Sequence, residues 1–178
     1  LLAELERMEG GPVAPMWGAD DEDSKTPLRP DLIDAGVNLT ACHNRDLAVH
    51  EGGKSYTLAP SHLSLPIKRF PGLALPCAFL FYQQSPIPLH LYDFALHLFA
   101  NYKNPQALVF YVPKLENEEE AQYLRDLFLQ AEQLLQQMDA SYQIGTVRVL
   151  VVLENPRAIL RTHEIMDALY PYFAGASL

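Results

Sequence analysis

The chain has 178 residues, of which 49% are hydrophobic, and this is enough for one domain with a sizeable core. Its formal charge is −9, from 13 basic and 22 acidic side chains, and no segment combines clustered Lys or Arg with aromatic residues. Such a chain would be repelled by a phosphate backbone, so the composition argues against nucleic-acid binding. We expect the acidity mainly to favour solubility.

Neither a membrane span nor a disulfide framework is expected. The longest apolar run, residues 73–82, contains Pro76 and is too short to cross a bilayer. The two cysteines, Cys42 and Cys77, form no C-x-x-C motif, and a chain of this size does not need disulfides for stability. We therefore expect a cytoplasmic protein with reduced thiols. The sequence gives no indication of the oligomeric state.

The first half of the chain predicts short elements separated by glycine and proline. The glycine pair Gly52-Gly53 lies between two extended segments, which is typical of a hairpin. Prolines from Pro71 to Pro88 exclude long helices between them. In chain order we expect a helix at 1–9, a short strand at 13–19, a short helix near Leu32, a hairpin at 46–58 and a strand at 63–70.

The second half alternates buried strands with amphipathic helices. Asn117 is suited to cap a helix whose first residues are three glutamates. The run 147–153 is nearly all apolar and β-branched, which is typical of a strand covered on both faces in a parallel sheet. The expected elements are a helix at 89–102, a strand at 109–112, a helix at 118–138, a strand at 147–153 and a helix at 162–173. This alternation predicts an α/β fold with parallel strands.

Charged residues follow four of the expected strands. Glu154 comes directly after 147–153, and the acidic segment 20–23, which includes Asp20 and Glu22, follows the first strand. Arg69 ends the strand at 63–70, and Lys114 follows the strand at 109–112. Since parallel strands end at the same edge of a sheet, these groups are candidates for a metal site and an anion site.

Each of these residues also has a structural interpretation. Glu154 could cap the following helix, and the segment 20–23 could be a solvated acidic loop or an N-cap cluster. Lys68 and Arg69 could form a surface pair, and the position of Lys114 is equally ambiguous. The coincidence of four strand ends favours a functional site more than any single residue does.

Two common types of active site find no support in the sequence. The six histidines show neither H-x-x-x-H nor H-E-x-x-H spacing, which argues against a zinc site. His90 and His97 are seven residues apart on one expected helix, so we expect both to serve packing or to face solvent. No serine lies in a G-x-S-x-G motif, which argues against a serine hydrolase.

Six segments, in order, resemble motifs of the A-type malate synthases. Asp20-Asp21-Glu22-Asp23-Ser24 is similar to the family's D-F-E-D-S, and Tyr111-Val112-Pro113-Lys114 is similar to its Y-L-P-K. Val152-Leu153-Glu154 resembles L-I-E. The other three matches are residues 31–39 with N-L-I-E-G-Q-I-N-L, 53–58 with G-K-x-Y-x-L, and 91–96 with L-F-D-F-A-L. They cover nearly the whole chain.

The resemblance implies a (β/α)₈ TIM barrel that condenses acetyl-CoA with glyoxylate, with Mg²⁺ as the cofactor. By this resemblance Glu154 is a carboxylate ligand of Mg²⁺ and Arg69 binds glyoxylate. Asp20 and Glu22 would stand near the metal or orient Arg69, and Lys114 would line the site. A complete barrel takes about 250 residues, so we expect residues 1–178 to form an incomplete barrel without a separate linker.

The resemblance also implies partners outside this chain. The family's second metal ligand lies in a following G-R-W-D-Y segment and its catalytic Asp base in a C-terminal domain. We therefore expect activity in the full-length protein and not in these 178 residues alone. Two alternatives remain open: a C–C lyase of the citrate lyase β or citramalyl-CoA type, and a non-catalytic barrel descendant. The segment after Arg69, Phe70-Pro71-Gly72-Leu73-Ala74, departs from the family's P-R-G-W-H.

Overall fold

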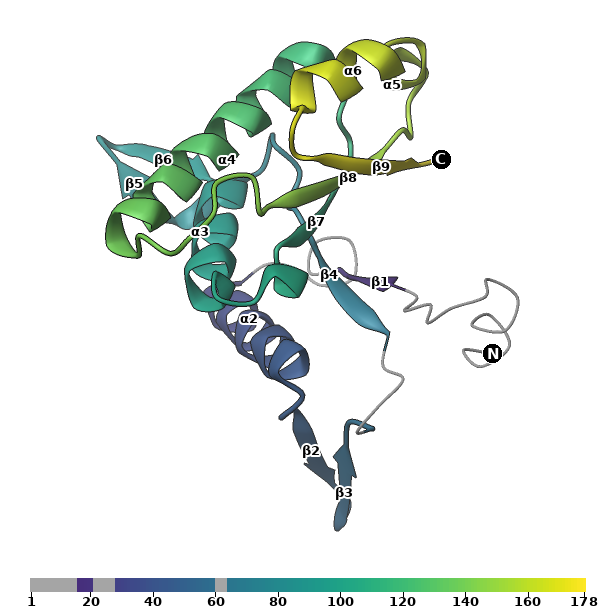
Figure 1. The fold of residues 1–178 in the computed structure, drawn as a ribbon. Coiled ribbons are helices and arrows are strands. Elements are labelled where there is room, and N and C mark those ends of the chain that lie inside the picture. Colours follow the sequence, from purple (N-terminus) through teal and green to yellow (C-terminus); the bar gives the residue numbers. More distant parts are fainter. Residues whose placement is uncertain (1–15, 21–27, 60–63) are drawn as a thin grey trace.

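The computed structural model describes residues 16–20, 28–59 and 64–178, and its centre is a parallel sheet (Figure 1). The sheet has five strands, in the order β1-β4-β7-β8-β9, and every neighbouring pair is parallel. The strands are β1 (Met16–Ala19), β4 (Leu65–Arg69), β7 (Val109–Val112), β8 (Arg148–Val152) and β9 (Phe173–Ser177). Their spatial order follows the chain order, as in a barrel, but among the described residues the sheet stays open at β1 and β9. The expected incomplete barrel is confirmed.

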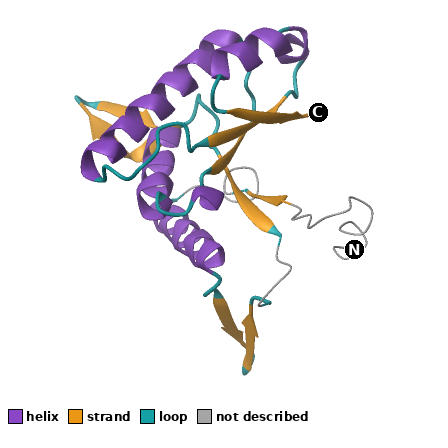
Figure 2. Cartoon of the chain, in the orientation of Figure 1, coloured by secondary structure: helices purple, strands orange, loops and turns teal. Residues whose placement is uncertain are grey.

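Helices connect the strands and lie to one side of the sheet (Figure 2). They are α2 (Arg29–Asn44), α3 (Leu89–Asn101), α4 (Glu118–Met138), α5 (Pro156–Leu160) and α6 (Thr162–Leu169), with a 3₁₀ turn η1 (Pro105–Ala107) before β7. The expected cap of α4 is confirmed, because the Asn117 side chain accepts a hydrogen bond from the Glu120 N–H at 2.9 Å. Within the described parts of the chain, no helix combines the length and the apolar character needed to span a membrane.

Two hairpins interrupt the alternation of strand and helix. β2 (Ala48–Glu51) pairs with β3 (Lys54–Thr57), which confirms the hairpin expected around the glycine pair. β5 (Pro76–Tyr82) pairs with β6 (Ser85–Pro88), and this hairpin was not predicted. Its turn places Gln83 and Gln84 at positive φ, 48° and 67°. Glycine or asparagine is the usual sequence signal for this conformation, and the turn has neither.

The core lies between the sheet and helices α3, α4 and α6. Its centre is an aromatic cluster in which Phe70, Phe94, Phe110 and Phe128 are each at most 2% exposed. The Phe94 ring lies 5.2 Å from both Phe110 and Phe128, in the range where aromatic pairs attract. Phe70 directly follows β4, and its N–H donates to the Tyr111 carbonyl at 2.8 Å. The end of β4 is therefore anchored in the core.

A fully buried carboxylate fixes the amino end of β8. Glu132 of α4 accepts hydrogen bonds from the N–H groups of Gly145, Thr146 and Val147 at 2.6–2.9 Å, and from the Tyr142 hydroxyl at 2.8 Å. Burial, and after it Glu132, raises the pKa of the Tyr142 hydroxyl, which therefore stays protonated as a donor. The loop before β8 is thereby held against α4.

Two predicted helices differ from the structure. α2 is a full helix of 16 residues rather than a short one near Leu32. It ends at Asn44, and the left-handed backbone of the next residue, Arg45, caps the last turn. The last helix was predicted to continue to 173, and this is wrong. It ends at Leu169 because Tyr170, which precedes Pro171, adopts an extended conformation, and residues 173–177 form β9.

Candidate functional site

Four residues predicted for the site lie at the carboxyl edge of the sheet. Asp20 directly follows β1, Arg69 ends β4, Lys114 lies two residues after β7, and Glu154 lies two residues after β8. The four strands are consecutive neighbours and all parallel, so the sheet brings the four residues to one edge. In α/β barrels this edge carries the catalytic groups. Glu22, the fifth predicted residue, lies outside the described residues.

Arg69 is nearly buried and forms an ion pair with Asp20. The Arg69 side chain is 7% exposed and that of Asp20 is 36% exposed, and the guanidinium Nη1 donates to the Asp20 carboxylate. The interpretation of Lys68 and Arg69 as a surface pair is wrong, because β4 is a covered strand whose last four residues are all buried. Asp20 thus holds the Arg69 guanidinium at the end of β4.

Lys68 belongs to a different environment from its neighbour. Its ammonium lies 3.0 Å from the carboxylate of Asp93 on α3, and both side chains are at most 7% exposed. Successive residues of a strand point to opposite faces of the sheet, so Lys68 faces the helices while Arg69 faces away from them. The ion pair with Asp93 fixes α3 on β4 and keeps the Lys68 ammonium on the helix side of the sheet, apart from the candidate site.

Glu154 is exposed and interacts with the loop that follows the neighbouring strand. Its Oε1 accepts a hydrogen bond from the backbone N–H of Lys114 at 2.6 Å. The alternative in which Glu154 caps the next helix is wrong, because Asn155 caps α5 by accepting from the Ala158 N–H at 2.8 Å. The structure therefore leaves the Glu154 carboxylate at the carboxyl edge, outside any helix cap.

The side chains of Glu154 and Arg69 are of the types that bind a magnesium ion and a substrate carboxylate. Mg²⁺ prefers hard oxygen ligands, which Glu154 provides, and an Arg presents a planar fork that matches a carboxylate substrate. Among the residues that the structure describes, no three His, Cys, Asp or Glu side chains gather into a metal cluster. Glu154 thus fits a magnesium ion as one ligand and needs further ligands from elsewhere.

Sequence reasoning missed the contribution of Asn155. While its side-chain oxygen caps α5, its Nδ2 donates to the Leu115 carbonyl at 3.1 Å. Asn before Pro at a helix start is a recognisable cap signal, and Asn155-Pro156 carries it. The contact with Leu115, forty residues away, has no signal in the sequence.

The histidines of α3 are packing residues, as expected. His97 and His90 are both buried, and Nε2 of His97 lies 2.8 Å from the Ala107 carbonyl. Nε2 of His90 lies 2.7 Å from the Tyr123 hydroxyl, and no described residue provides a partner for its Nδ1. Burial lowers the pKa of His90 to about 4, so its ring is neutral at pH 7.

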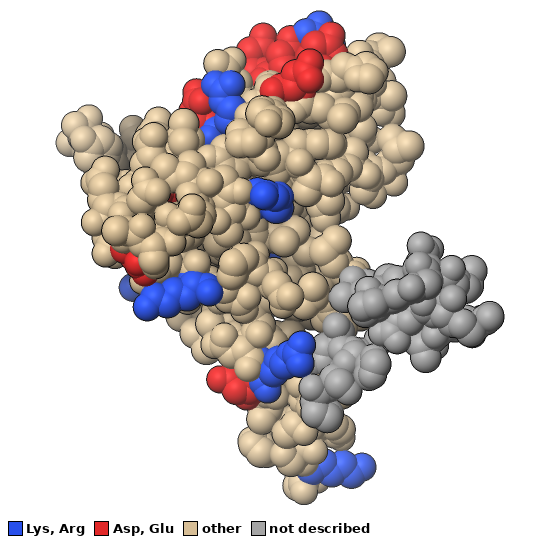
Figure 3. Space-filling view, in the orientation of Figure 1, with Lys and Arg blue, Asp and Glu red and all other residues tan. Residues whose placement is uncertain are grey.

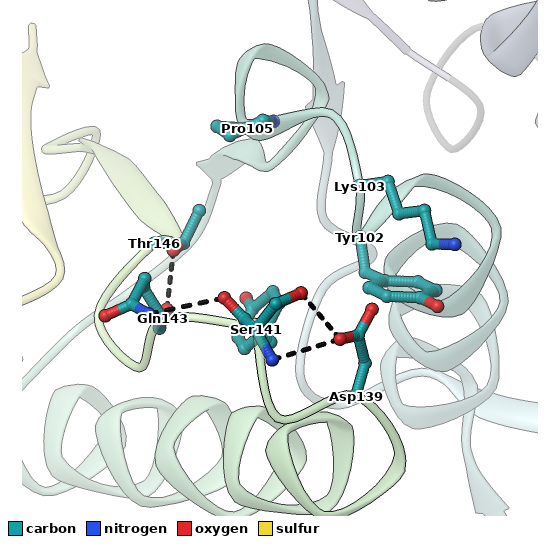
Figure 4. Close-up of a pocket in the computed structure, with 8 residues that line it drawn as sticks. Tyr102, Lys103, Pro105, Asp139, Ser141, Gln143 and Thr146 are labelled. Carbon is teal, nitrogen blue, oxygen red and sulfur yellow. Dashed lines mark hydrogen bonds between the residues drawn. The ribbon is translucent and has the colours of Figure 1, made fainter.

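A pocket of about 420 Å³ opens at the other edge of the sheet (Figure 4). It lies between the end of α3 and the loop from α4 to β8, and Tyr102, Lys103, Asp139 and Ser141 line it together with other residues. Asp139 accepts from the hydroxyl and the N–H of Ser141, at 2.6 and 3.0 Å, and these bonds lower its pKa. Because this pocket lies at the amino ends of the strands, it is separate from the candidate site.

The distribution of charged side chains on the surface (Figure 3) agrees with the excess of acidic over basic residues in the sequence. On the face shown in Figure 3, Lys and Arg side chains are scattered, and acidic side chains gather over the end of the molecule where α4 begins and α6 lies. This end includes Glu118, Glu119 and Glu120 in the first turn of α4 and Glu164 in that of α6. No basic surface for a nucleic acid is visible on this face.

Comparison with known proteins agrees with this geometry. The family model "Malate synthase, TIM barrel domain" matches residues 66–176. The chain is 33% identical over 165 residues to malate synthase A of Escherichia coli K12, covering 88% of this chain and 29% of that protein. It is 32% identical over 170 residues to the malate synthase of Streptomyces clavuligerus, covering 91% of this chain and 30% of that protein. The chain thus spans about 29% of the first of these relatives.

Solved structures show the same fold. A Haloferax volcanii malate synthase, described as a magnesium/glyoxylate complex, superimposes with a TM-score of 0.52 at 14% identity, covering 94% of this chain and 42% of that one. At this identity the likeness concerns the fold alone. The family match, which includes β4, β7, β8 and most of β9, carries the assignment. The chain belongs to the malate synthase family and forms part of its TIM barrel domain.

Proposed function

We propose that this chain is the part of a malate synthase barrel that holds the substrate arginine and one magnesium carboxylate. The reaction would be the Mg²⁺-dependent condensation of acetyl-CoA with glyoxylate, giving malate and CoA. The observation that carries the proposal is that Asp20, Arg69, Lys114 and Glu154 lie at the carboxyl edge of four adjacent parallel strands. Residues 1–178 would form one partial catalytic domain.

Arg69 would bind the carboxylate of glyoxylate and stabilise the oxygen that gains negative charge. A guanidinium held in a nearly buried position loses little freedom when it binds, and its electrostatic effect is stronger than in water. Asp20 would act on the substrate through Arg69, because it orients the guanidinium. Glu22 would stand near the metal, and Lys114 would line the site.

Glu154 would be a ligand of Mg²⁺, which in such a site polarises the aldehyde of glyoxylate. Its exposed carboxylate at the end of β8 supports this role. The remaining metal ligand and the base that removes a methyl proton from the thioester are expected in other parts of the full-length protein. The whole activity is therefore a property of that protein, of which this chain would be about a third or less.

The location within the cell follows from the proposal only in part. We propose a cytoplasmic protein, on the basis of its acidic composition and its two free cysteines. The relative from Candida tropicalis, 29% identical over 164 residues, is named a glyoxysomal malate synthase. Fractionation of cells with an antibody against the protein distinguishes the two compartments.

The test is the release of thiol from acetyl-CoA in the presence of glyoxylate and Mg²⁺. We expect the full-length protein to release CoA and form malate, and residues 1–178 alone to be inactive. Cleavage of citramalyl-CoA without condensation would identify the lyase alternative instead. If the full-length protein catalyses neither reaction but folds normally, the non-catalytic alternative is correct.

A further inference from the structure

The backbone of Lys114 has an unusual conformation at the candidate site. Lys114 has a φ of 58°, in the left-handed region that is unfavourable for residues with a Cβ. Three other non-glycine residues in the described parts of the chain share this feature. Arg45 closes helix α2, and Gln83 and Gln84 form the turn of the β5–β6 hairpin. Lys114 has neither of these local reasons.

The contact with Glu154 provides a reason for this conformation. The left-handed backbone directs the Lys114 N–H across to the end of the neighbouring strand, where it donates to Oε1 of Glu154 at 2.6 Å. A hydrogen bond from an N–H to a carboxylate is charge-assisted and about twice as strong as a neutral one. Such a bond offsets part of the cost of a strained residue.

The residues on either side of Lys114 are anchored in the structure. Pro113 and Leu115 are both buried, and the Leu115 side chain is 0% exposed in the main core cluster. The carbonyl of Leu115 accepts from Nδ2 of Asn155, the residue next to Glu154. Two hydrogen bonds therefore join the loop after β7 to the loop after β8, one ending on Glu154 itself and one beside it.

We propose that the Lys114 peptide N–H, held in place by Asn155, positions the Glu154 carboxylate for a divalent cation. The N–H donates to Oε1 from one side and so restricts the rotation of the carboxylate. Groups around a metal ligand usually orient it in this way. Lys114 and Asn155 are positioning residues in this proposal. The inference rests on the proposed function, because it assumes that Glu154 is a metal ligand.

The test measures Mg²⁺ affinity by calorimetry in the full-length protein, so that it does not depend on turnover. Replacing Lys114 by its α-hydroxy acid analogue turns the peptide bond between Pro113 and Lys114 into an ester. The change puts an oxygen in place of the N–H donor and keeps the Lys114 side chain. We expect this change to weaken Mg²⁺ binding about tenfold or more. Lys114→Gly keeps the N–H and removes the side chain, so it should weaken Mg²⁺ binding clearly less than the ester does.

Asn155→Ser provides a second, independent variant in case the ester does not fold. Serine still caps α5 but is too short to reach the Leu115 carbonyl, so we expect a smaller weakening, on the order of threefold to tenfold. Asn117→Ser is the matched control, because it changes a helix cap in the same way at α4 and should leave the Kd unchanged.

The outcomes separate this inference from the proposed function. The inference is overturned if the ester and Asn155→Ser bind Mg²⁺ like the wild type while Glu154→Ala loses binding. It is also overturned if Lys114→Gly weakens binding as much as the ester, because the side chain would then be responsible. If Glu154→Ala binds Mg²⁺ like the wild type, the metal site of the proposed function is wrong, and this inference with it.

Discussion

The two ends of strand β8 carry two carboxylates in opposite circumstances. At the amino end, Glu132 is fully buried and accepts four hydrogen bonds, three of them from successive backbone N–H groups. At the carboxyl end, Glu154 is exposed, and from the residues that the structure describes it accepts one hydrogen bond, from the Lys114 N–H. The carboxylate oxygens of Glu132 are occupied by hydrogen bonds that stabilise the fold. The exposed carboxylate of Glu154 can still bind a ligand. The contrast separates a structural carboxylate from a candidate functional one.

The largest expected effect is a loss of stability when the carboxylate at the amino end of β8 is removed. Glu132→Ala would leave three backbone N–H groups and the Tyr142 hydroxyl buried without their acceptor, so we expect the free energy of unfolding to fall by at least about 3 kcal/mol. Urea unfolding measures this loss. Glu154→Ala is the matched control at the other end and should change the stability by less than about 1 kcal/mol. If both variants lost the same free energy of unfolding, the distinction between a structural Glu132 and a functional Glu154 would be wrong.

The next largest effect concerns substrate binding at the carboxyl end. Arg69→Lys replaces a planar fork by a point charge, so we expect the KM for glyoxylate in the full-length protein to rise about tenfold to a hundredfold. Lys68→Arg, on the adjacent residue, is a control for changes in the strand, because Lys68 faces Asp93 and the helices. Unchanged KM and kcat in Arg69→Lys would refute the role of Arg69.

A smaller effect depends on pH and concerns His90, a buried histidine of α3. The pKa of His90 is lowered from 6.5 to about 4 by burial, so the unfolded chain binds a proton that the folded chain does not bind between these values. Stability from this group is present above about pH 6.5 and is lost as the pH falls toward 4. We expect a loss of about 2 kcal/mol between pH 7 and pH 5.

Unfolding of wild type and His90→Gln across this pH range measures that loss. Glutamine can keep a hydrogen bond to Tyr123 and does not titrate, so the variant should show a shallower pH dependence. Parallel curves for the two proteins would show that His90 does not contribute to acid sensitivity.

The smallest expected effect is on a helix start. Asn117→Ala removes the side chain that accepts from the Glu120 N–H, and we expect a loss of about 1 kcal/mol in unfolding free energy. Asn117→Asp keeps the acceptor and should stay close to the wild type. A loss as large as that of Glu132→Ala would mean that the cap also supports the carboxyl edge.

The sequence predicted the elements whose signals are local. The apolar run of β8 and the cap at Asn117 both concern neighbouring residues, and the structure confirms them. The β5–β6 hairpin was missed because its turn uses Gln83 and Gln84 at positive φ, where the usual signal is glycine or asparagine. β9 was missed because an apolar stretch near Phe173 continued a helical pattern that Pro171 ends.

The sequence predicted which residues belong to the candidate site, but it did not predict the hydrogen bonds between them. Strand ends are visible in the sequence, so Arg69 and Glu154 could be named as strand-end residues. The hydrogen bonds from Lys114 to Glu154 and from Asn155 to Leu115 each join residues forty positions apart, and only the parallel pairing of β7 with β8 brings them together. Long-range geometry of this kind follows from the sheet and not from spacing.

Magnesium binding by the full-length protein tests the central claim most directly. Calorimetry would compare the wild type with Glu154→Ala and with Glu116→Ala, which removes another exposed carboxylate beyond the end of β7. We predict that Glu154→Ala loses measurable Mg²⁺ binding and that Glu116→Ala keeps the wild-type Kd. Equal affinity in the wild type and Glu154→Ala would contradict the account, because the exposed carboxylate at the end of β8 would then hold no metal.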